Sequence, residues 1–207
     1  MGYFPFFIDI RDKRCIVIGG GTVALRKLEK LIPFEPRITV IAPEICEKIT
    51  ELDNIAIEKR SFEENDLDGA FMAVSATDNE ELNARIFELC AGKNILVNTV
   101  DDKEKCGFIF PALVHENDVT IGITTSGRSP LYAKFLREKI EDLLDGFHPE
   151  ASELLGRYRP FIKCIFGTER KRREAFEAIL NLCIAEGDIP SDEEIDTMLE
   201  VLKQSEN

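Results

Sequence analysis

The first half of the chain alternates short apolar runs with longer segments that are apolar on one side only. The short runs are rich in β-branched residues, which is typical of strands buried in a parallel sheet. The longer segments carry apolar residues at helical spacing. This alternation predicts an α/β fold with a parallel sheet and crossover helices. The predicted strands are residues 15–18, 37–42, 55–59, 71–76 and 95–100.

Two helices are predicted between these strands. One follows residue 22 and ends before Pro33, because proline cannot continue a helix. The other is expected to begin at a capping box formed by Asp78 and Glu81. Ahead of the first strand, the apolar residues 4–10 are expected to lead into the sheet as an edge segment.

The pattern changes near residue 113, where the regular alternation of strand and helix stops. An extended run over residues 119–125 precedes Ser129 and Pro130, which together form a typical helix start. This run and the helix after it are too small to bury their own apolar sides. We therefore expect them to pack on the first domain or to meet a second copy across a symmetric interface.

The last part of the chain is helical in pattern, with a second capping box at Ser191 and Glu194. The sequence thus predicts three parts. They are a parallel-sheet domain over residues 1–113, a small α+β dimerisation segment over residues 114–146, and a helical C-terminal domain over residues 147–207.

A glycine turn follows the first predicted strand directly. Gly19, Gly21 and Ala24 fit the G-x-G-x-x-A pattern of Rossmann-type dinucleotide-binding domains. In that pattern the glycines allow a tight turn and a close approach of backbone to a pyrophosphate. The helix that follows would point its free N–H groups and the positive end of its dipole at the pyrophosphate. We therefore predict a binding site for NAD in the first domain.

The end of the second predicted strand departs from the usual dinucleotide pattern. An acidic residue normally closes this strand and binds the ribose hydroxyls. Here the strand ends at Ala42 and is followed by Pro43 and Glu44, so the acidic residue comes late. Since no arginine follows to bind a 2′-phosphate, the pattern favours NAD over NADP. Thr77, after the fourth strand, is expected at the same edge of the sheet, where ligands bind.

Composition excludes several classes of partner. The chain has 39 acidic and 26 basic residues and a net charge of −13, which disfavours binding to nucleic acid or to an anionic membrane. It has no apolar run long enough to span a bilayer and no secretion signal, so we expect a cytoplasmic protein. The six cysteines are scattered without a C-x-x-C pair, which is typical of reduced thiols used as small apolar residues.

Three common types of catalytic site do not fit. Tyr132 is followed four residues later by Leu136, whereas a short-chain dehydrogenase needs lysine there. His115 and His148 are the only histidines and lack metal-ligand spacing, so no metal site is expected. The G-x-S-x-G motif of serine hydrolases is absent.

Two polar segments remain as candidate sites. Residues 98–103 follow the fifth predicted strand, where the nicotinamide end of a bound dinucleotide is expected. Residues 124–130 form a hydroxyl-rich loop that opens a helix, a natural anion site. Basic residues cluster around both segments and could bind an acidic substrate. Asp101 and Asp102 could equally form a plain turn, and the role that we favour for Ser129 is the helix cap. The basic residues are Lys103, Lys105, Arg128, Lys134 and Arg137.

Four motifs together resemble the precorrin-2 dehydrogenase family, which includes stand-alone enzymes of siroheme synthesis and the N-terminal module of fused siroheme synthases. The motifs are residues 17–27 (VIGGGTVALRK), 98–102 (NTVDD), 108–112 (FIFPA) and 125–130 (TSGRSP). Their order and spacing match the family over about residues 3–145. The sequence has no continuation long enough for a methyltransferase domain, so within this family we expect the stand-alone form.

The resemblance implies an NAD-dependent oxidation of precorrin-2 to sirohydrochlorin and, in some members, insertion of ferrous iron to give siroheme. It also implies a homodimer built through the segment after the first domain. Asp101 falls on the family's essential aspartate, which is proposed as the general base. Thr22, Val23, Pro43 and Glu44 fall on its dinucleotide contacts. Thr125 falls where some members carry a phosphorylatable serine in the tetrapyrrole site.

Precorrin-2 carries many carboxylates, which would give the basic residues around the two polar segments a function. The residues expected to bind substrate are Asn98, Lys103, Lys105, Thr125, Ser126 and Arg128. A second hypothesis is an NAD-sensing regulatory domain without catalysis. It would account for the glycine turn and the dimer segment but gives no role to Asp101.

Overall fold

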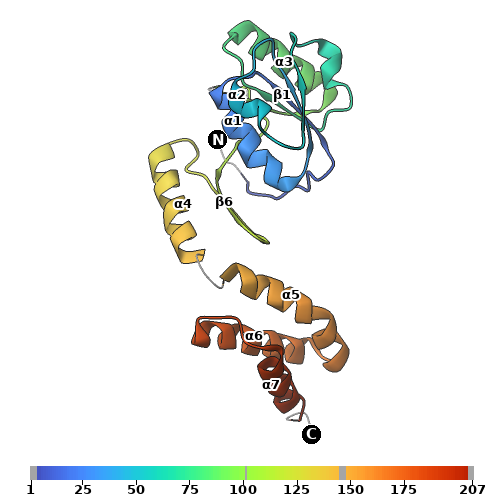
Figure 1. The fold of residues 1–207 in the computed structure, drawn as a ribbon, viewed down its shortest axis with the longest axis vertical. Coiled ribbons are helices and arrows are strands. Elements are labelled where there is room, and N and C mark those ends of the chain that lie inside the picture. Colours follow the sequence, from blue (N-terminus) through green and yellow to red (C-terminus); the bar gives the residue numbers. More distant parts are fainter. Residues whose placement is uncertain (1–3, 101, 145–147, 205–207) are drawn as a thin grey trace. The chain divides into compact units, whose positions relative to one another are not determined.

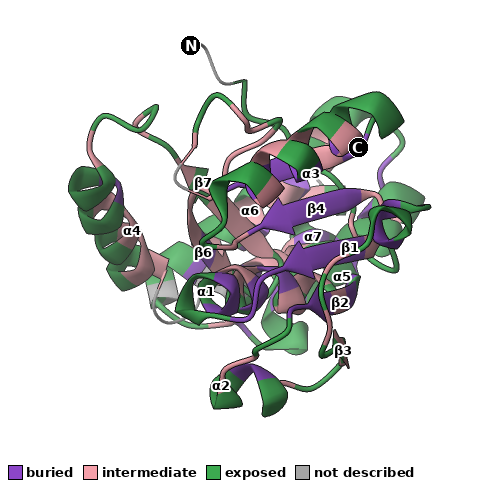
Figure 2. Cartoon of the chain, turned by 90° about the horizontal axis from the view of Figure 1, so that it is seen from above, coloured by how far each residue is buried: buried purple, intermediate pink, exposed green. Residues whose placement is uncertain are grey.

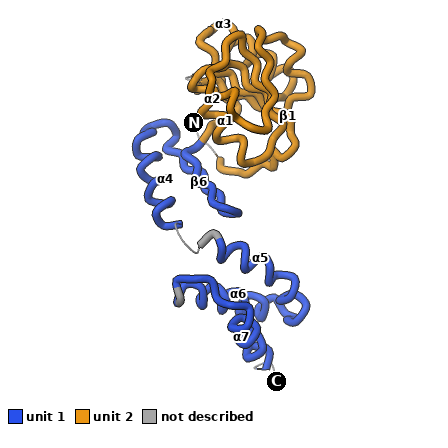
Figure 3. The backbone as a smooth tube through the Cα atoms, viewed as in Figure 1, with its two compact units in different colours: residues 1–3, 111–207 blue, residues 4–110 orange. Residues whose placement is uncertain are grey.

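The computed structural model describes residues 4–100, 102–144 and 148–204, and these residues fold into two compact units. One unit spans Phe4–Phe110, and the other begins at Pro111 (Figure 3). The change of unit falls three residues before the boundary predicted at residue 113. The further division near residue 146 stays a prediction.

The first unit is built on a five-stranded sheet with the order β3-β2-β1-β4-β5, in which every neighbouring pair is parallel (Figure 1). This confirms the predicted α/β fold. The most buried strands occupy its centre, as Figure 2 shows for β1 and β4. The strands are β1 (Arg14–Ile18), β2 (Arg37–Ile41), β3 (Ile55–Glu58), β4 (Met72–Ser75) and β5 (Leu96–Thr99).

Helices cover both faces of this sheet. Alternate residues of β1 point to opposite faces: Val17 packs in the cluster that includes Leu28 of α1, whereas Ile16 packs in the cluster that includes Ile86 of α3. The helical elements are α1 (Thr22–Leu31), η1 (Ile32–Phe34), α2 (Glu47–Thr50), η2 (Glu64–Leu67) and α3 (Glu80–Lys93).

The predicted start of α3 was wrong by one residue. Asn79, not Asp78, is the N-cap, and its side-chain oxygen accepts a hydrogen bond from the Leu82 N–H at 2.9 Å. Asparagine caps a helix as well as aspartate does, so sequence alone does not separate the two neighbours.

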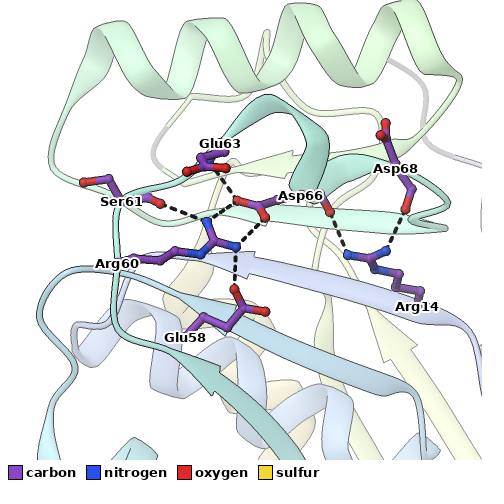
Figure 4. Close-up of polar contacts among 7 residues, drawn as sticks. All are labelled: Arg14, Glu58, Arg60, Ser61, Glu63, Asp66 and Asp68. Carbon is purple, nitrogen blue, oxygen red and sulfur yellow. Dashed lines mark hydrogen bonds and ion pairs between the residues drawn. The ribbon is translucent and has the colours of Figure 1, made fainter.

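The crossover from β3 to β4 contains only the short turn η2, and two arginines fix it (Figure 4). Arg60 donates to both carboxylate oxygens of Asp66, at 2.8 and 2.6 Å, and also pairs with Glu58. Arg14 donates to the carbonyl oxygens of Asp66 and Asp68 at 3.0 and 2.7 Å. The hydrogen bond from Arg60 lowers the pKa of Asp66, which is buried yet remains charged. Leu67 of the same turn is fully buried in the apolar core, so polar contacts and apolar packing together hold this crossover.

Residues 4–10 do not form the predicted edge segment of the sheet. They adopt no strand, and Phe4, Phe6 and Phe7 are 84%, 67% and 75% exposed. Only Ile10 packs against the core, just before the polar turn closed by the Lys13 N–H and the Ile10 carbonyl at 3.0 Å. The apolar sequence of residues 4–10 thus suggested that these side chains would be buried, but the first unit leaves most of them exposed.

The second unit begins with an antiparallel hairpin of β6 (Ala112–Glu116) and β7 (Val119–Ile123). Helix α4 (Pro130–Leu144) packs on this hairpin. The predicted cap is confirmed, because the Ser129 hydroxyl accepts a hydrogen bond from the Tyr132 N–H at 3.2 Å.

The last three helices share a core of their own, built from residues such as Ile162, Ile179 and Leu199. The predicted capping box is present, since the Ser191 N–H donates to Glu194 at 2.8 Å and the Glu194 N–H donates to the Ser191 hydroxyl at 3.3 Å. Among the described residues, no helix is long and apolar enough to cross a membrane. The three helices are α5 (His148–Ile165), α6 (Glu169–Glu186) and α7 (Asp192–Gln204).

Candidate dinucleotide site and Asp101 loop

The glycine turn after β1 lies against two neighbouring loops of the first unit. Gly19 has φ +122°, and a Cβ there would stand 2.2 Å from the Ala76 carbonyl oxygen, in the loop after β4. A Cβ on Gly20 would stand 2.0 Å from the Glu44 carbonyl oxygen, in the loop after β2. Both positions therefore require glycine because of the protein's own packing.

Gly20 was missed by the sequence reasoning, which used only Gly19 and Gly21. Backbone hydrogen bonds reinforce the contact: the Gly19 N–H donates to the Ile41 carbonyl at 3.0 Å, and the Cys46 N–H donates to the Gly20 carbonyl at 2.9 Å. The signal in the sequence that could have identified Gly20 is the run of three consecutive glycines, of which it is the middle one.

Gly21 differs from its two neighbours. Its φ is −88°, and no protein atom lies within 4 Å of where its Cβ would stand. Neither backbone strain nor packing within the described chain explains a glycine there. The open space fits a ligand whose phosphates come close to the backbone, the role of the second glycine in dinucleotide-binding turns.

The start of α1 is suited to an anion. Gly21 is the N-cap, so no side chain caps the helix, and the first turn holds no acidic residue. The N–H groups at Thr22 and Val23 thus face the turn without a competing carboxylate, and the helix dipole favours negative charge there. Ala24 is fully buried and allows close packing of α1 on the sheet. These residues fit the pyrophosphate of a dinucleotide.

Pro43 and Glu44 are exposed in the loop after β2, directly beside the glycine turn. The loop after β4 lies on the other side and holds Thr77. The parallel register of β1, β2 and β4 places all three loops at the carboxyl edge of the sheet, as predicted.

Thr77 is held by Asn83, a buried residue of α3 that the sequence reasoning missed. The Asn83 side-chain oxygen accepts hydrogen bonds from the hydroxyls of Ser75 and Thr77, both at 2.7 Å, and its amide donates to the Thr77 carbonyl at 3.0 Å. The sequence does contain a signal for Asn83. At helical spacing it falls on the same side of α3 as the apolar residues Ile86 and Cys90, which indicates a buried polar side chain.

Asp101, the predicted general base, lies outside the described residues. Its neighbour Asp102 is fully used by a turn: one carboxylate oxygen accepts from the N–H groups of Glu104 and Lys105 at 3.1 and 3.3 Å. The other pairs with the Lys105 ammonium at 2.8 Å. This hydrogen bond from Lys105 lowers the pKa of Asp102 and raises that of Lys105. Asp102 is therefore a weak base.

The chain returns beside β5 after this loop. Asn98 and Cys106 form an antiparallel bridge, and the Gly107 N–H donates to the Val97 carbonyl at 2.8 Å. Asn98, predicted to bind substrate, is buried, and its amide donates to the Phe108 carbonyl at 3.0 Å and to the Cys106 sulfur at 3.4 Å. Among the described residues, the Asn98 amide therefore holds the returning segment that contains Cys106 and Phe108.

The second hydroxyl-rich segment lies in the second unit, between β7 and α4. The Thr125 hydroxyl donates to the Ser129 carbonyl at 3.0 Å and accepts from the Ser129 N–H at 3.2 Å. Ser126 and Gly127 have positive φ, 54° and 73°, which makes a tight bend. Ser126 and Arg128 are exposed on it. The predicted substrate residues therefore form one group on each unit.

The parallel sheet, the glycine turn and the open start of α1 define a Rossmann-type dinucleotide-binding domain. Residues 6–112 match the protein family described as "Putative NAD(P)-binding", and the chain belongs to this family. The predicted cofactor is thereby confirmed as a nicotinamide dinucleotide.

The chain is similar to several siroheme synthases. It is 36% identical over 189 residues to that of Vesicomyosocius okutanii subsp. Calyptogena okutanii, an alignment covering 90% of this chain and 41% of the relative. It is 36% identical to that of Thioalkalivibrio sulfidiphilus, over 87% of this chain and 37% of the relative. The siroheme synthase of Pseudoalteromonas translucida is 37% identical over 87% of this chain and 39% of its own length. The chain spans about two fifths of the length of these relatives.

The solved structure of SirC, described as a precorrin-2 dehydrogenase, has the same fold. Its TM-score is 0.75 at 21% sequence identity, with 98% of this chain and 100% of that chain covered. Together with the relatives, this confirms the resemblance that the four sequence motifs indicated.

Proposed function

We propose that this protein oxidises precorrin-2 to sirohydrochlorin with NAD as the oxidant. The observation that carries the proposal is the shared edge of the sheet. The dinucleotide turn after β1 and the loop after β5, which holds Asp101, both lie at the carboxyl ends of parallel strands. The similarity to siroheme synthases and to SirC supports the tetrapyrrole as substrate.

The reaction removes one hydride and one proton from the substrate. NAD, when bound, supplies the acceptor for the hydride. The proton needs a base in the protein, and we assign this role to Asp101, because Asp102 is held as a carboxylate by Lys105 and two backbone N–H groups. The glycine turn and the first N–H groups of α1 would hold the cofactor's pyrophosphate, and Glu44 would bind a ribose and favour NAD over NADP.

Lys103 and Lys105 of the first unit, and Thr125, Ser126 and Arg128 of the second, are predicted from sequence to bind carboxylates of precorrin-2. Asn98 was predicted with them, but it is buried and its amide donates to the Phe108 carbonyl, so we leave it out of the proposal. Lys105 is paired with Asp102 in the structure, so it would have to exchange this carboxylate for one of the substrate. Both side chains of the pair are partly exposed, so breaking the ion pair would cost little free energy.

We further propose that the same site inserts ferrous iron, as a substrate, into sirohydrochlorin. Insertion releases two pyrrole protons, which a base such as Asp101 would accept. We place the reaction in the cytoplasm, where the six free thiols would stay reduced.

The direct test is anaerobic incubation of the purified chain with precorrin-2 and NAD, with absorbance recorded for NADH and for the tetrapyrrole. We expect NADH and sirohydrochlorin to form in equal amounts, and added ferrous iron to convert the product to siroheme faster than in a protein-free control. NAD binding without turnover would reject the proposal and favour the NAD-sensing domain.

We also propose a homodimer through α4. Leu131, Tyr132 and Phe135 are 79%, 54% and 49% exposed on this helix, an apolar surface that is costly to leave in water. A second copy would cover it through a symmetric contact.

Substitution of Phe135 by glutamate is expected to convert a dimer into monomers, because it would bury a charge in the interface. Sedimentation equilibrium measures the outcome. Ile184→Glu is the matched control, since Ile184 is 56% exposed on α6, outside the proposed interface, and should leave the dimer intact. A monomeric wild-type chain, or a dimer that the Phe135 variant retains, would contradict the proposal.

A further inference from the structure

The loop after β4 forms one side of the glycine turn. The Ala76 N–H donates to the Ile18 carbonyl at 2.8 Å, directly before the turn. On Gly19 a Cβ would stand 2.2 Å from the Ala76 carbonyl oxygen and 3.3 Å from the Thr77 nitrogen. The nearest atoms are thus backbone atoms of this loop, and they leave no free space beside Gly19. A displacement of Thr77 would therefore change the shape of the turn.

Asn83 of α3 holds Thr77 at two points. Its side-chain oxygen accepts a hydrogen bond from the Thr77 hydroxyl at 2.7 Å, and its amide donates to the Thr77 carbonyl at 3.0 Å. Two contacts from one side chain fix both the position and the orientation of Thr77. The Thr77 hydroxyl also lies 3.2 Å from the N–H and from the carbonyl oxygen of Asn79. This hydroxyl is therefore engaged within the protein.

Asn83 is itself firmly supported. It is 8% exposed, and its side-chain oxygen also accepts a hydrogen bond from the Ser75 hydroxyl of β4 at 2.7 Å. Ile86 and Cys90, on the same side of α3, are fully buried in the apolar cluster of this face of the sheet. A buried polar group that loses its partner is costly, so these hydrogen bonds tie the loop to the core.

The two hydroxyls that meet at the Asn83 oxygen have different locations. Ser75 is the last residue of β4 and is fully buried within the sheet, whereas Thr77 lies in the loop beside the turn. If Asn83 only stabilised the fold, the two hydrogen bonds would be equivalent. If Asn83 also shapes the turn, only the hydrogen bond from Thr77 should affect a ligand.

We propose that Asn83 is a positioning residue for NAD. By holding Thr77, it keeps the loop after β4 against the glycine turn, in the arrangement that binds the dinucleotide. This inference rests on the proposed placement of NAD at that turn. A binding site is precise only when the residues behind it are held by packing and hydrogen bonds. Asn83 is buried and touches no atom of the cofactor in this scheme.

The experiment measures the Kd for NAD by isothermal titration calorimetry in Asn83→Ala, Thr77→Val and the control Ser75→Ala. Each variant is measured at a temperature at which its circular dichroism is native. We expect Asn83→Ala to raise Kd about tenfold, the lower end of what the loss of a supporting hydrogen bond costs at metal sites. Thr77→Val should raise Kd about threefold, because the Asn83 amide still holds the Thr77 carbonyl. Ser75→Ala, which removes the other hydroxyl from the same oxygen, should bind NAD as the wild type does.

A double variant tests whether Asn83 acts through Thr77. Asn83→Ala has already removed the hydrogen bond that Thr77→Val would remove. The variant that carries both changes should therefore bind NAD as weakly as Asn83→Ala alone. Amide hydrogen exchange supplies a readout without cofactor. In Asn83→Ala, peptides over residues 76–79 should exchange faster, while peptides from β1 should be unchanged.

A wild-type Kd in Asn83→Ala would overturn the inference. Equal effects of Thr77→Val and Ser75→Ala would do the same, since Asn83 would then serve the fold alone. A further loss of affinity when Thr77→Val is added to Asn83→Ala would mean that the Thr77 hydroxyl contacts the cofactor directly, which also contradicts the inference. If Asn83→Ala does not fold, Thr77→Val and its control decide the question. If Gly21→Ala leaves the NAD affinity unchanged, the placement of the dinucleotide at this turn is rejected, whatever the Asn83 variants show.

Discussion

Replacement of Asp101 by asparagine is expected to lower kcat for the oxidation of precorrin-2 by about 10²- to 10⁴-fold, the usual contribution of a general base. Asparagine has nearly the same shape as aspartate but cannot accept a proton at neutral pH. The affinity for NAD, measured by isothermal titration calorimetry, should stay unchanged, because the dinucleotide is bound by a different turn. Iron insertion should fall together with dehydrogenation if one base serves both steps.

Asp102→Asn is the matched control for this prediction. It makes the same chemical change one residue away, yet it should lower kcat by no more than about fivefold. The ion pair with Lys105 is exposed to solvent, and exposed pairs of this kind contribute little. Equal losses in the two variants would mean that the loop, rather than Asp101, was disturbed. An Asp101→Asn variant as active as the wild type would refute the catalytic role and favour the NAD-sensing hypothesis.

The sheet and its helices were predictable because their pattern is local and repeated. A buried parallel strand is apolar throughout and a crossover helix is apolar on one side, so β1, β4 and α1 stand out from single stretches of sequence. The glycine turn was found for the same reason. Its residues are consecutive, and their order after a strand and before a helix is the pattern itself.

Features that depend on distant contacts were not predictable in the same way. Gly20 is required by the carbonyl of Glu44, which approaches from another loop. Cys106 was interpreted only as one of several scattered thiols, because its contacts with Thr99 and Asp102 exist only once the loop has closed. For residues 4–10 the prediction itself was wrong. An apolar run suggests burial but does not specify which surface will cover it, and here the phenylalanines are exposed.

Two glycines of the turn are expected to have different roles, Gly19 in packing and Gly21 in ligand binding. Alanine substitutions at the two positions should distinguish these roles. Gly19→Ala places a Cβ 2.2 Å from the Ala76 carbonyl oxygen at a φ of +122°. Backbone strain and overpacking each cost about 1–3 kcal/mol, so the first unit should lose roughly 2–6 kcal/mol of its free energy of unfolding. Native-state hydrogen exchange of the amides in β1 and β4 measures this quantity for the first unit alone.

Gly21→Ala should behave in the opposite way. Its backbone conformation is open to any residue and no protein atom lies near its Cβ position, so stability should change by no more than about 1 kcal/mol, the typical cost of a weaker N-cap. NAD affinity, however, should fall about tenfold or more, which corresponds to about 1.4 kcal/mol, because the added methyl group would occupy the space left for the pyrophosphate. If Gly21→Ala binds NAD as tightly as the wild type, the dinucleotide does not approach the helix at this residue. If it destabilises the sheet as much as Gly19→Ala does, the glycine serves the fold and not the ligand.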